Sequence, residues 1–252
     1  MEQVHPQELN SPVRLKMIYN NTGESPGLQA AWGLSVWIEQ DGEVTLMDTG
    51  GDAAILMENL RNARLDPAKI STLVITHDHW DHKNGLKGLV GNPAFHAEIF
   101  VPEKVSKAYE TEYPTARFRG ISNPEEIAPG IWSTGSIETM YNGNPLYEQS
   151  LVLVRSNMLF LLTGCSHPGI SHIVQRVIEL FPGKTLALVA GGFHMGSHKE
   201  EEVRLISADL RQQGVLKIAP SHCTGGEAIS LFRKEWNYDF TEFNLGDELV
   251  IP

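Results

Sequence analysis

One stretch of seven residues constrains this chain more than any other: Thr76-His77-Asp78-His79-Trp80-Asp81-His82. It follows the short apolar strand expected at 73–75 and holds three histidines and two aspartates, more than a solvated loop needs. Imidazole and carboxylate groups are ligands of zinc, iron and manganese, and a catalytic ion keeps one position open for water. We expect His77 and His79 to converge on one metal ion, and Asp81 and His82 to face a second.

The composition sets limits on class and partners. The chain has 252 residues, 41% of them hydrophobic, and a formal net charge of -11. A chain of this length and composition can bury a large core. Its negative net charge argues against a basic surface for nucleic acid or for anionic lipid. No segment offers the ~20 uninterrupted apolar residues of a membrane span. Met1 to Leu9 lacks the apolar core of a signal peptide, so we expect a cytoplasmic protein with no membrane partner.

Apolar strands alternate with helices along the chain, and no repeat or linker divides it. We therefore predict one domain over residues 1–252, of α/β class. Hydrophobic periodicity predicts strands at 13–19, 36–38, 44–47, 73–75, 99–101, 151–154, 159–162, 186–189 and 217–219, and helices after Asp52, from Ile170 and around 203–210. Asp41-Gly42 predicts a hairpin turn. Four strands, ending near residues 76, 164, 190 and 219, lead into loops that carry histidines.

The three later loops add further metal-binding residue types. They read Thr163-Gly164-Cys165-Ser166-His167-Pro168-Gly169, Gly191-Gly192-Phe193-His194 and Ser221-His222-Cys223-Thr224-Gly225. Cys165 and Cys223 are the only cysteines in the chain, so disulfides are not the source of its stability, although one bond between them is an alternative. The remaining histidines, at positions 5, 96, 172 and 198, have no such motif around them and are not predicted site residues.

The motif His77-x-His79-x-Asp81-His82, with Asp48-Thr49-Gly50 upstream, resembles the signature of the metallo-β-lactamase superfamily. The resemblance implies an αββα sandwich, in which two mixed β-sheets pack face to face with helices outside. It also implies that Asp48 stands behind the metal ligands, where a carboxylate fixes the orientation of an imidazole ring. The alternative for Asp48 is a turn-forming residue before two glycines.

Motifs over nearly the whole chain narrow the resemblance to one branch. It is the branch named after 7,8-dihydropterin-6-methyl-4-(β-D-ribofuranosyl)aminobenzene 5′-phosphate synthase. Besides the three loops above, the motifs are Trp32-Gly33-Leu34-Ser35 and Glu148-Gln149-Ser150-Leu151-Val152. The namesakes join a pterin to an aminobenzene ribofuranoside phosphate, whereas most members of the branch are otherwise described as metal-dependent hydrolases.

The chain departs from the wider superfamily in its ligand set. A third histidine for the first metal, usual in a Gly-His-Thr setting, is absent, and Cys165 stands where a bridging Asp is usual. We expect His167 to replace the missing histidine. For Cys165, a metal ligand and a buried thiol are both open. His222 stands where the last metal histidine belongs, and His194 could be a ligand, a substrate clamp or a proton donor.

These observations predict a metal-dependent hydrolase that uses a metal-bound hydroxide to cleave an ester, phosphodiester or lactone of a small molecule. The cofactors would be two divalent ions, zinc first, with iron and manganese as alternatives. Asp81 would orient the nucleophile and His194 would transfer a proton. Related di-iron electron-transfer proteins carry Glu at the position of His79, which favours hydrolysis over redox catalysis.

Two alternatives stay open, a synthase and a metal-binding sensor without turnover. The synthase would join a pterin pyrophosphate to an aminobenzene ribofuranoside phosphate, with Trp32, Tyr141, Glu148 and Gln149 around the entrance for two substrates. In either enzyme the substrate would be a small molecule, with an anionic or phosphorylated one favoured. Specificity would depend on the loops of residues 109–143, which carry no readable motif.

Overall fold

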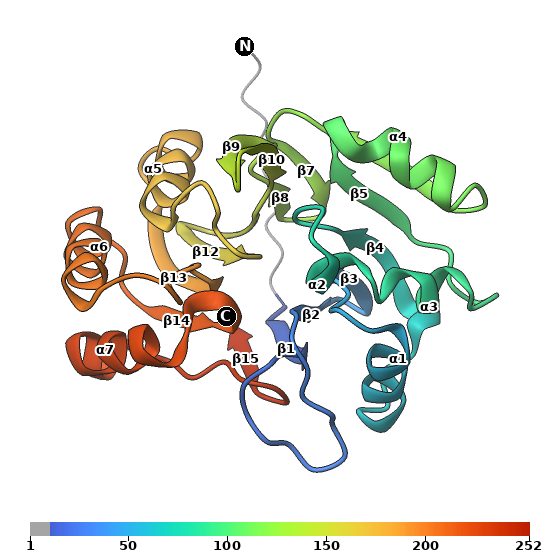
Figure 1. Cartoon of the computed structure of the whole chain (residues 1–252), viewed down its shortest axis with the longest axis horizontal. Coiled ribbons are helices and arrows are strands. Elements are labelled where there is room, and N and C mark those ends of the chain that lie inside the picture. The colour runs from blue at the N-terminus through green and yellow to red at the C-terminus, as the bar shows by residue number, and fades with distance from the viewer. Residues whose placement is uncertain (1–10) are drawn as a thin grey trace.

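A seven-stranded sheet forms the first half of the computed structural model, which describes residues 11–252 (Figure 1). The segment Met1 to Leu9, on which the cytoplasmic prediction depends, lies outside the described residues. The strand order in this sheet is β15-β1-β2-β3-β4-β5-β6. The strands are β1 (Val13–Tyr19), β2 (Ser35–Gln40), β3 (Glu43–Met47), β4 (Ile70–Val74), β5 (Glu98–Pro102), β6 (Arg117–Ile121) and, from the other end of the chain, β15 (Glu248–Ile251).

The second half forms a six-stranded sheet with the order β14-β13-β12-β11-β8-β7. Its strands are β7 (Glu125–Ala128), β8 (Ile131–Ser133), β11 (Leu151–Arg155), β12 (Met158–Thr163), β13 (Thr185–Gly192) and β14 (Ile218–Ser221). A separate hairpin of β9 (Ile137–Tyr141) and β10 (Asn144–Glu148) precedes β11. Strands β12, β13 and β14 run parallel, so their carboxyl ends lie at the same edge of the sheet.

Helices cover the outer faces of both sheets. The first sheet is covered by α1 (Ala53–Asn62), α3 (Leu86–Val90) and α4 (Glu103–Glu112), and the second by α5 (Ile170–Leu180), α6 (Glu200–Gln212) and α7 (Gly226–Trp236), on opposite sides of the molecule in Figure 1. Four short helical segments complete the described chain: α2 (Trp80–Lys83), η1 (Pro67–Lys69), η2 (His222–Thr224) and η3 (Asn237–Asp239).

Three hydrophobic layers hold this arrangement together. Between the sheets, Leu15 and Met17 of β1 pack in one cluster with Leu153 of β11 and Phe160 of β12. The other two layers lie between each sheet and its helices. Because both sheets are covered on both faces, central strands such as β4 and β12 are buried throughout their carboxyl-terminal halves. The fold is the predicted αββα sandwich.

Local sequence signals explain several boundaries. Asp41 and Gly42 both have positive φ, 53° and 84°, as the tight turn between β2 and β3 requires. The Asp52 side chain accepts the amides of Ala54 and Ile55 and so begins α1. Two predictions need correction. Strand β13 extends to Gly192, three residues beyond the predicted end. The stretch 109–143, predicted as loops, contains the last turn of α4 and the strands β6, β7, β8 and β9.

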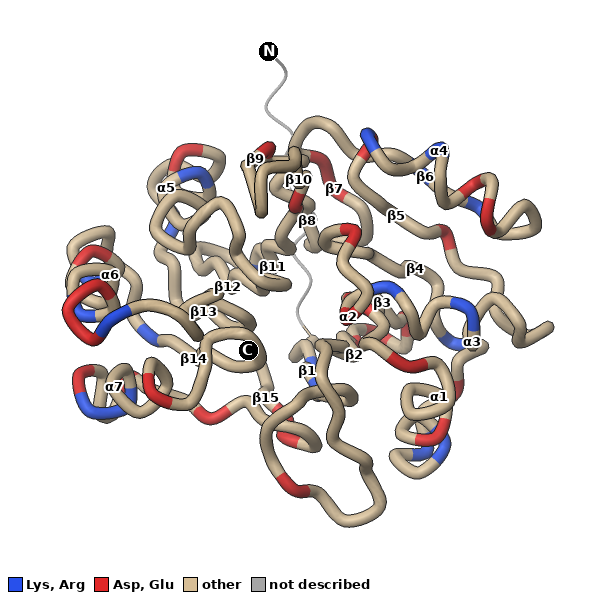
Figure 2. The backbone as a smooth tube through the Cα atoms, viewed as in Figure 1, with Lys and Arg blue, Asp and Glu red and all other residues tan. Residues whose placement is uncertain are grey.

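Charged side chains lie mostly along the outer helices and the connections next to them (Figure 2). The strands β12, β13 and β14, whose carboxyl ends lead into the later histidine loops, contain no charged residue. Within residues 11–252, none of the helices combines the length and the apolar character that crossing a bilayer would require.

Candidate metal centre

The turn after β4 and the short helix α2 carry the first four predicted ligands. Thr76 ends the strand, because its amide and its hydroxyl both donate to the Asp48 carboxylate, at 2.7 and 2.8 Å. Helix α2 then begins at Trp80, and the carbonyl of His79 just before it accepts the amide of His82. The side chains of His77 and His82 are fully buried. Their ring centroids are 4.1 Å apart, and the ring of His79 lies 4.7 Å from that of His77.

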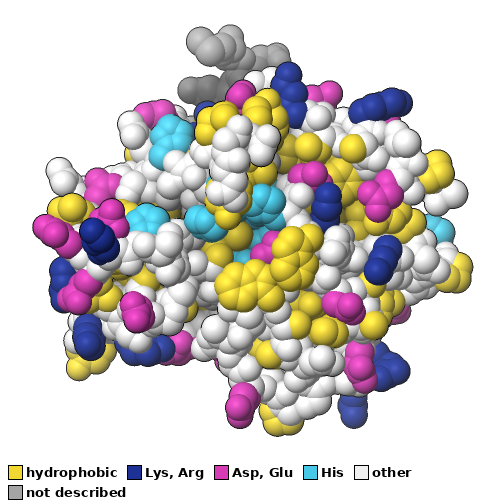
Figure 3. Space-filling model, in the orientation of Figure 1, with side chains coloured by type: hydrophobic (Ala, Val, Ile, Leu, Met, Phe, Trp, Pro, Cys, Tyr) yellow, Lys and Arg dark blue, Asp and Glu magenta, His cyan; other side chains and the backbone are white. Residues whose placement is uncertain are grey.

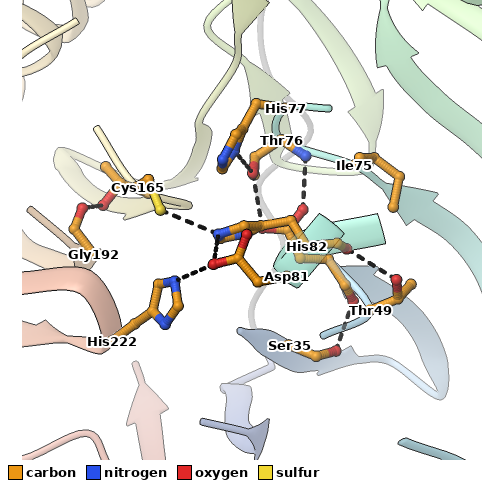
Figure 4. Close-up of polar contacts among 12 residues, drawn as sticks. Ser35, Thr49, Ile75, Thr76, His77, Asp81, His82, Cys165, Gly192 and His222 are labelled. Atoms are coloured by element: carbon orange, nitrogen blue, oxygen red, sulfur yellow. Dashed lines mark hydrogen bonds and ion pairs between the residues drawn. The ribbon is translucent and has the colours of Figure 1, made fainter. Parts of the chain in front are cut away.

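Two histidines from the second sheet meet this cluster. The ring of His167, after β12, lies 4.7 Å from His77 and 4.7 Å from His79. The ring of His222, after β14, lies 5.1 Å from His82. Figure 4 shows His77, His82 and His222 converging with Asp81 and Cys165 at the edge between the sheets. The structure thus brings together the predicted ligands from three separate strand ends.

Cys165 lies at the middle of this group. Its Sγ is 3.1 Å from Nε2 of His82. Two sets of possible ligand atoms, each within a span of 4.8 Å, share it: His77 with His167, and His82 with His222. His79 belongs to neither set; it is half-buried at the outer side of the cluster. Cys165 therefore stands where a ligand common to two ions would stand, and its role as a ligand stays a prediction.

A second set of residues fixes the orientation of four of these rings. In each ring Nδ1 has a partner: Thr76 Oγ1 for His77 at 3.0 Å, Asp48 Oδ2 for His82 at 2.7 Å, Glu148 Oε2 for His167 at 2.9 Å and Asn21 Oδ1 for His222 at 2.7 Å. Since one nitrogen of each ring is occupied, the other, Nε2, is available to a cation. This is the arrangement by which proteins orient metal-binding imidazoles.

The available nitrogens fit a metal ion. Nε2 of His77 and Nε2 of His222 are buried and have no hydrogen-bond partner within residues 11–252, a costly state for polar atoms unless something else binds them. Burial lowers the pKa of His77 well below its usual value and that of His82 to about 3, so both rings are neutral at physiological pH. Neutral imidazoles with free lone pairs are the form that binds divalent cations.

Asp81 lies on the side of His82 and His222. Its Oδ2 is 3.4 Å from Nε2 of His222 and 3.8 Å from Nε2 of His82, and it accepts the indole N–H of Trp32 at 2.9 Å. Burial opposes ionisation of Asp81, but the neighbouring histidines outweigh it and lower the pKa of this carboxyl. Asp81 is therefore a carboxylate at neutral pH and can bind a cation or accept a proton.

Asp48 is placed as predicted, behind the ligands. It is fully buried, with a left-handed φ of 57°, and its carboxylate holds both Thr76 and His82. Burial raises the pKa of Asp48 well above its usual value, and the hydrogen bonds from Thr76 oppose that shift. The hydrogen bonds from Thr76 thus favour the ionised form of Asp48 against burial, and the same side chain orients His82.

Glu148, one of the four residues that the synthase alternative would use around the entrance, is instead packed in the interior. Its side chain is buried beneath the loop after β12, where one carboxylate oxygen accepts the amides of Cys165 and Ser166 and the other accepts the amide and Nδ1 of His167. Burial opposes its ionisation, but His77, His167 and the backbone amide of Ser166 hold the pKa of Glu148 well below its usual range. Gln149, also predicted at the entrance, is fully buried and bridges the sheets.

The sequence analysis also missed Asn21, which lies 201 residues before its partner His222. Its side chain bonds both the ring and the carbonyl of His222. No motif surrounds Asn21, and no sequence signal could have identified it.

His194 and Cys223 lie on the second sheet's side of this group, after β13 and β14. The His194 ring is 4.3 Å from that of His167, which places it beside the predicted ligands. Cys165, His194 and Cys223 form a third set of possible ligand atoms within 4.8 Å of one another. Both thiols are free and buried. Burial opposes ionisation of Cys223, but the neighbouring Cys165 and His194 lower its pKa to about 7, while burial raises the pKa of Cys165. Cys223 was not predicted as a site residue.

Aromatic side chains surround the opening of the centre. Trp32 and Trp80 are 50% and 54% exposed, unusually high for this residue type. Trp32 lies against the ring of His222, and Tyr141 of the β9–β10 hairpin contacts His79, His167 and His194. Figure 3 shows histidines gathered in a hollow at the middle of this face, with hydrophobic side chains around it.

Comparisons with known proteins agree with this geometry. A family model described as the metallo-beta-lactamase superfamily matches residues 33–174. A 7,8-dihydropterin-6-methyl-4-(β-D-ribofuranosyl)-aminobenzene-5′-phosphate synthase of Methanocaldococcus jannaschii is 28% identical to this chain over 80% of its length and 82% of the relative's. An uncharacterized protein of the same organism is 25% identical over 86% and 92% of the two chains.

A solved structure has the same fold. It is a metal-dependent hydrolase of the beta-lactamase superfamily, with a TM-score of 0.77 and 23% sequence identity. The likeness covers 94% of this chain and 98% of the other.

Proposed function

The chain belongs to the metallo-beta-lactamase superfamily, and from that premise we propose that it is a metal-dependent hydrolase of a small ester, phosphodiester or lactone. One observation supports this most: imidazoles from three strand ends converge on Cys165 with buried, unpartnered Nε2 atoms on His77 and His222. Divalent cations bound there, zinc first among them, would supply Lewis acidity to polarise the scissile bond and activate water.

Asp81 is the group that would hold the attacking water. Its carboxylate is ionised, points toward His82 and His222, and is fixed from the outer side by Trp32. A carboxylate held in this way can accept a hydrogen bond from water and so aim its oxygen at the substrate.

His194 is the group that would carry a proton to the leaving oxygen. Its ring centroid lies 4.3 Å from that of His167 and 5.5 Å from that of Tyr141. A cavity of about 170 Å³ next to it, lined by residues that include Ser166, His167, Phe193 and Ile206, gives room for a leaving group.

A substrate panel tests the proposal. The full-length protein, loaded with zinc or manganese, should hydrolyse at least one of a set of chromogenic phosphodiesters, esters and lactones. His79→Ala should abolish that turnover, whereas His172→Ala, which changes an exposed histidine on α5, should leave it unchanged. Metal binding without turnover of any class would contradict the hydrolase and favour the sensor alternative.

The aromatic opening favours a second candidate, a synthase acting on planar rings. Two half-exposed tryptophans beside the centre offer faces on which an aromatic substrate can stack. The similar synthase from Methanocaldococcus jannaschii joins, by its name, pterin and aminobenzene groups. Incubation of the metal-loaded protein with a pterin pyrophosphate and an aminobenzene ribofuranoside phosphate, followed by mass spectrometry for the condensed product, distinguishes the two enzymes.

A further inference from the structure

Cys223 has no part in the centre described so far, yet it lies within reach of two groups that can bind a metal. Possible ligand atoms of Cys165, His194 and Cys223 all lie within 4.8 Å of one another. The three residues come from the ends of β12, β13 and β14, which are neighbours in the parallel part of the sheet. Two thiols and an imidazole at this spacing match the donor set of zinc sites.

Two of the three donor groups lack a strong partner among residues 11–252. There, Cys223 has only a long contact, 3.6 Å, from its sulfur to the carbonyl oxygen of Cys165. Nδ1 of His194 is buried and has no hydrogen-bond partner in the same part of the chain. The third group, Cys165 Sγ, lies 3.1 Å from Nε2 of His82 and faces the main centre as well. An unpartnered buried nitrogen beside a weakly bonded thiol is costly for the fold unless a cation binds there.

The backbone around the set is unusual in a way that brings the donors together. His194 has a left-handed φ of 51°, which is rare for a residue with a side chain. Gly192, two residues before His194, has no side chain and so leaves room for the Cys223 sulfur. A Cβ at Gly192 would lie 2.6 Å from that sulfur. The close approach of the two loops therefore requires glycine at this position and places the Cys223 thiol against β13.

We propose that Cys165, His194 and Cys223 form an additional site for a thiophilic divalent cation, such as zinc or cadmium. Binding would displace the two thiol protons to solvent and leave a cation held by two thiolates and one imidazole, with a position open for a further ligand. Cys165 would connect this site to the His82 and His222 side of the main centre. An imidazole that holds a cation cannot also donate a proton, so the role proposed for His194 in hydrolysis applies to the protein with this additional site empty. The test of the site measures binding alone and does not depend on turnover.

Cadmium binding to the full-length protein, purified under reducing conditions, tests the proposal. We expect the wild type to retain one cadmium ion more per chain than Cys223→Ser. The variant should also show about half of the ultraviolet sulfur-to-cadmium absorption of the wild type. Met195→Leu is the matched control, since it changes a buried sulfur residue on the same loop without changing the donor set. Equal cadmium content and equal absorption in the wild type and Cys223→Ser would overturn the proposal.

A second measurement needs no variant and so is independent of any folding defect. X-ray absorption at the cadmium edge counts the sulfur neighbours of the bound ion in the wild type. Cadmium with two sulfur neighbours and at least one nitrogen neighbour is the expected result. If no bound cadmium has more than one sulfur neighbour, Cys223 is not a ligand and the additional site does not exist.

Discussion

Glu148 Oε2 lies 2.9 Å from Nδ1 of His167, and the same carboxylate accepts three consecutive backbone amides of the loop that carries this histidine. One buried side chain therefore fixes both the loop and the ring. Glu148→Gln keeps the size of the side chain but removes its charge and half of its accepting capacity. We expect the affinity for zinc to fall about 10- to 100-fold, as is typical when a residue behind a metal ligand is changed.

Competition with a chromophoric chelator measures this affinity. Glu138→Gln, at an exposed position on β9, is the matched control and should bind zinc as the wild type does. Unchanged affinity in Glu148→Gln, with the loop intact, would show that His167 does not bind the metal.

The buried histidines should make the metal-free protein sensitive to acid. Burial and the nearby His222 lower the pKa of His82 to about 3, from 6.5 in an unfolded chain. Between these values the unfolded chain binds a proton that the folded protein does not. The free energy of unfolding should therefore be constant with respect to this group above pH ~6.5 and fall as the pH drops toward 3, by up to ~1.4 kcal/mol per pH unit.

Urea unfolding of the chelator-treated protein at several pH values measures this slope. His82→Gln should reduce it, whereas His172→Gln, at an exposed position, should keep the wild-type slope. A slope that is the same in all three proteins would mean that His82 takes up its proton in the folded state as easily as in the unfolded one.

Much of the fold follows from sequence patterns because most strands and helices have one strongly apolar face. Helix α5 buries Ile170, Ile173, Val174 and Val177 at the predicted spacing. The edge strands β6 and β7 could not be predicted in the same way. Their residues are mostly only partly buried, with burial that does not alternate cleanly, so neither presents the apolar face that a pattern search detects.

Sequence patterns likewise identify some residues of the candidate site and not others. The predicted ligands lie on loops that follow apolar strands, where the chain order and the fold both place them. Among the residues that orient the ligands, Asp48 was identified through its motif, but Asn21 was missed and Glu148 was misplaced, because a buried hydrogen bond depends on which segments meet in space. Asn21 and His222 are 201 residues apart, and only the pairing of β15 with β1 and the path of the loop after β1 bring them together.

Gly85 should be essential for the position of α2. It lies between α2 and α3, and a Cβ there would overlap the carbonyl oxygen of Thr49 and lie 2.8 Å from Leu56. Thr49 in turn bonds the carbonyl of His82 through its amide and hydroxyl. Gly85→Ala should lower the free energy of unfolding by about 1–3 kcal/mol, as overpacking of a core does.

Urea unfolding measures this loss as well. Gly226→Ala, at the start of α7 with no atom within 4 Å of the added Cβ, should be neutral or slightly stabilising. If the two alanine variants were equally stable, α2 would not be wedged against Thr49.

Trp32 should act on catalysis through Asp81 rather than through stacking alone. Trp32→Phe keeps an aromatic face but removes the N–H that donates to Asp81 at 2.9 Å. A hydrogen bond to a charged group contributes up to ~3 kcal/mol, and half-exposure reduces that to ~1 kcal/mol, or roughly fivefold in rate. We expect kcat to fall by this factor with KM nearly unchanged, in steady-state kinetics on the best substrate of the panel.

Trp80→Phe is the matched control, because Trp80 is equally exposed beside the same opening. Its side chain makes no hydrogen bond to the carboxylate among residues 11–252, so kcat should stay at the wild-type value. If both tryptophans serve only as a stacking surface, the two variants should behave alike and any change should appear in KM. A kcat effect confined to Trp32→Phe would therefore identify the indole N–H as the group that positions Asp81.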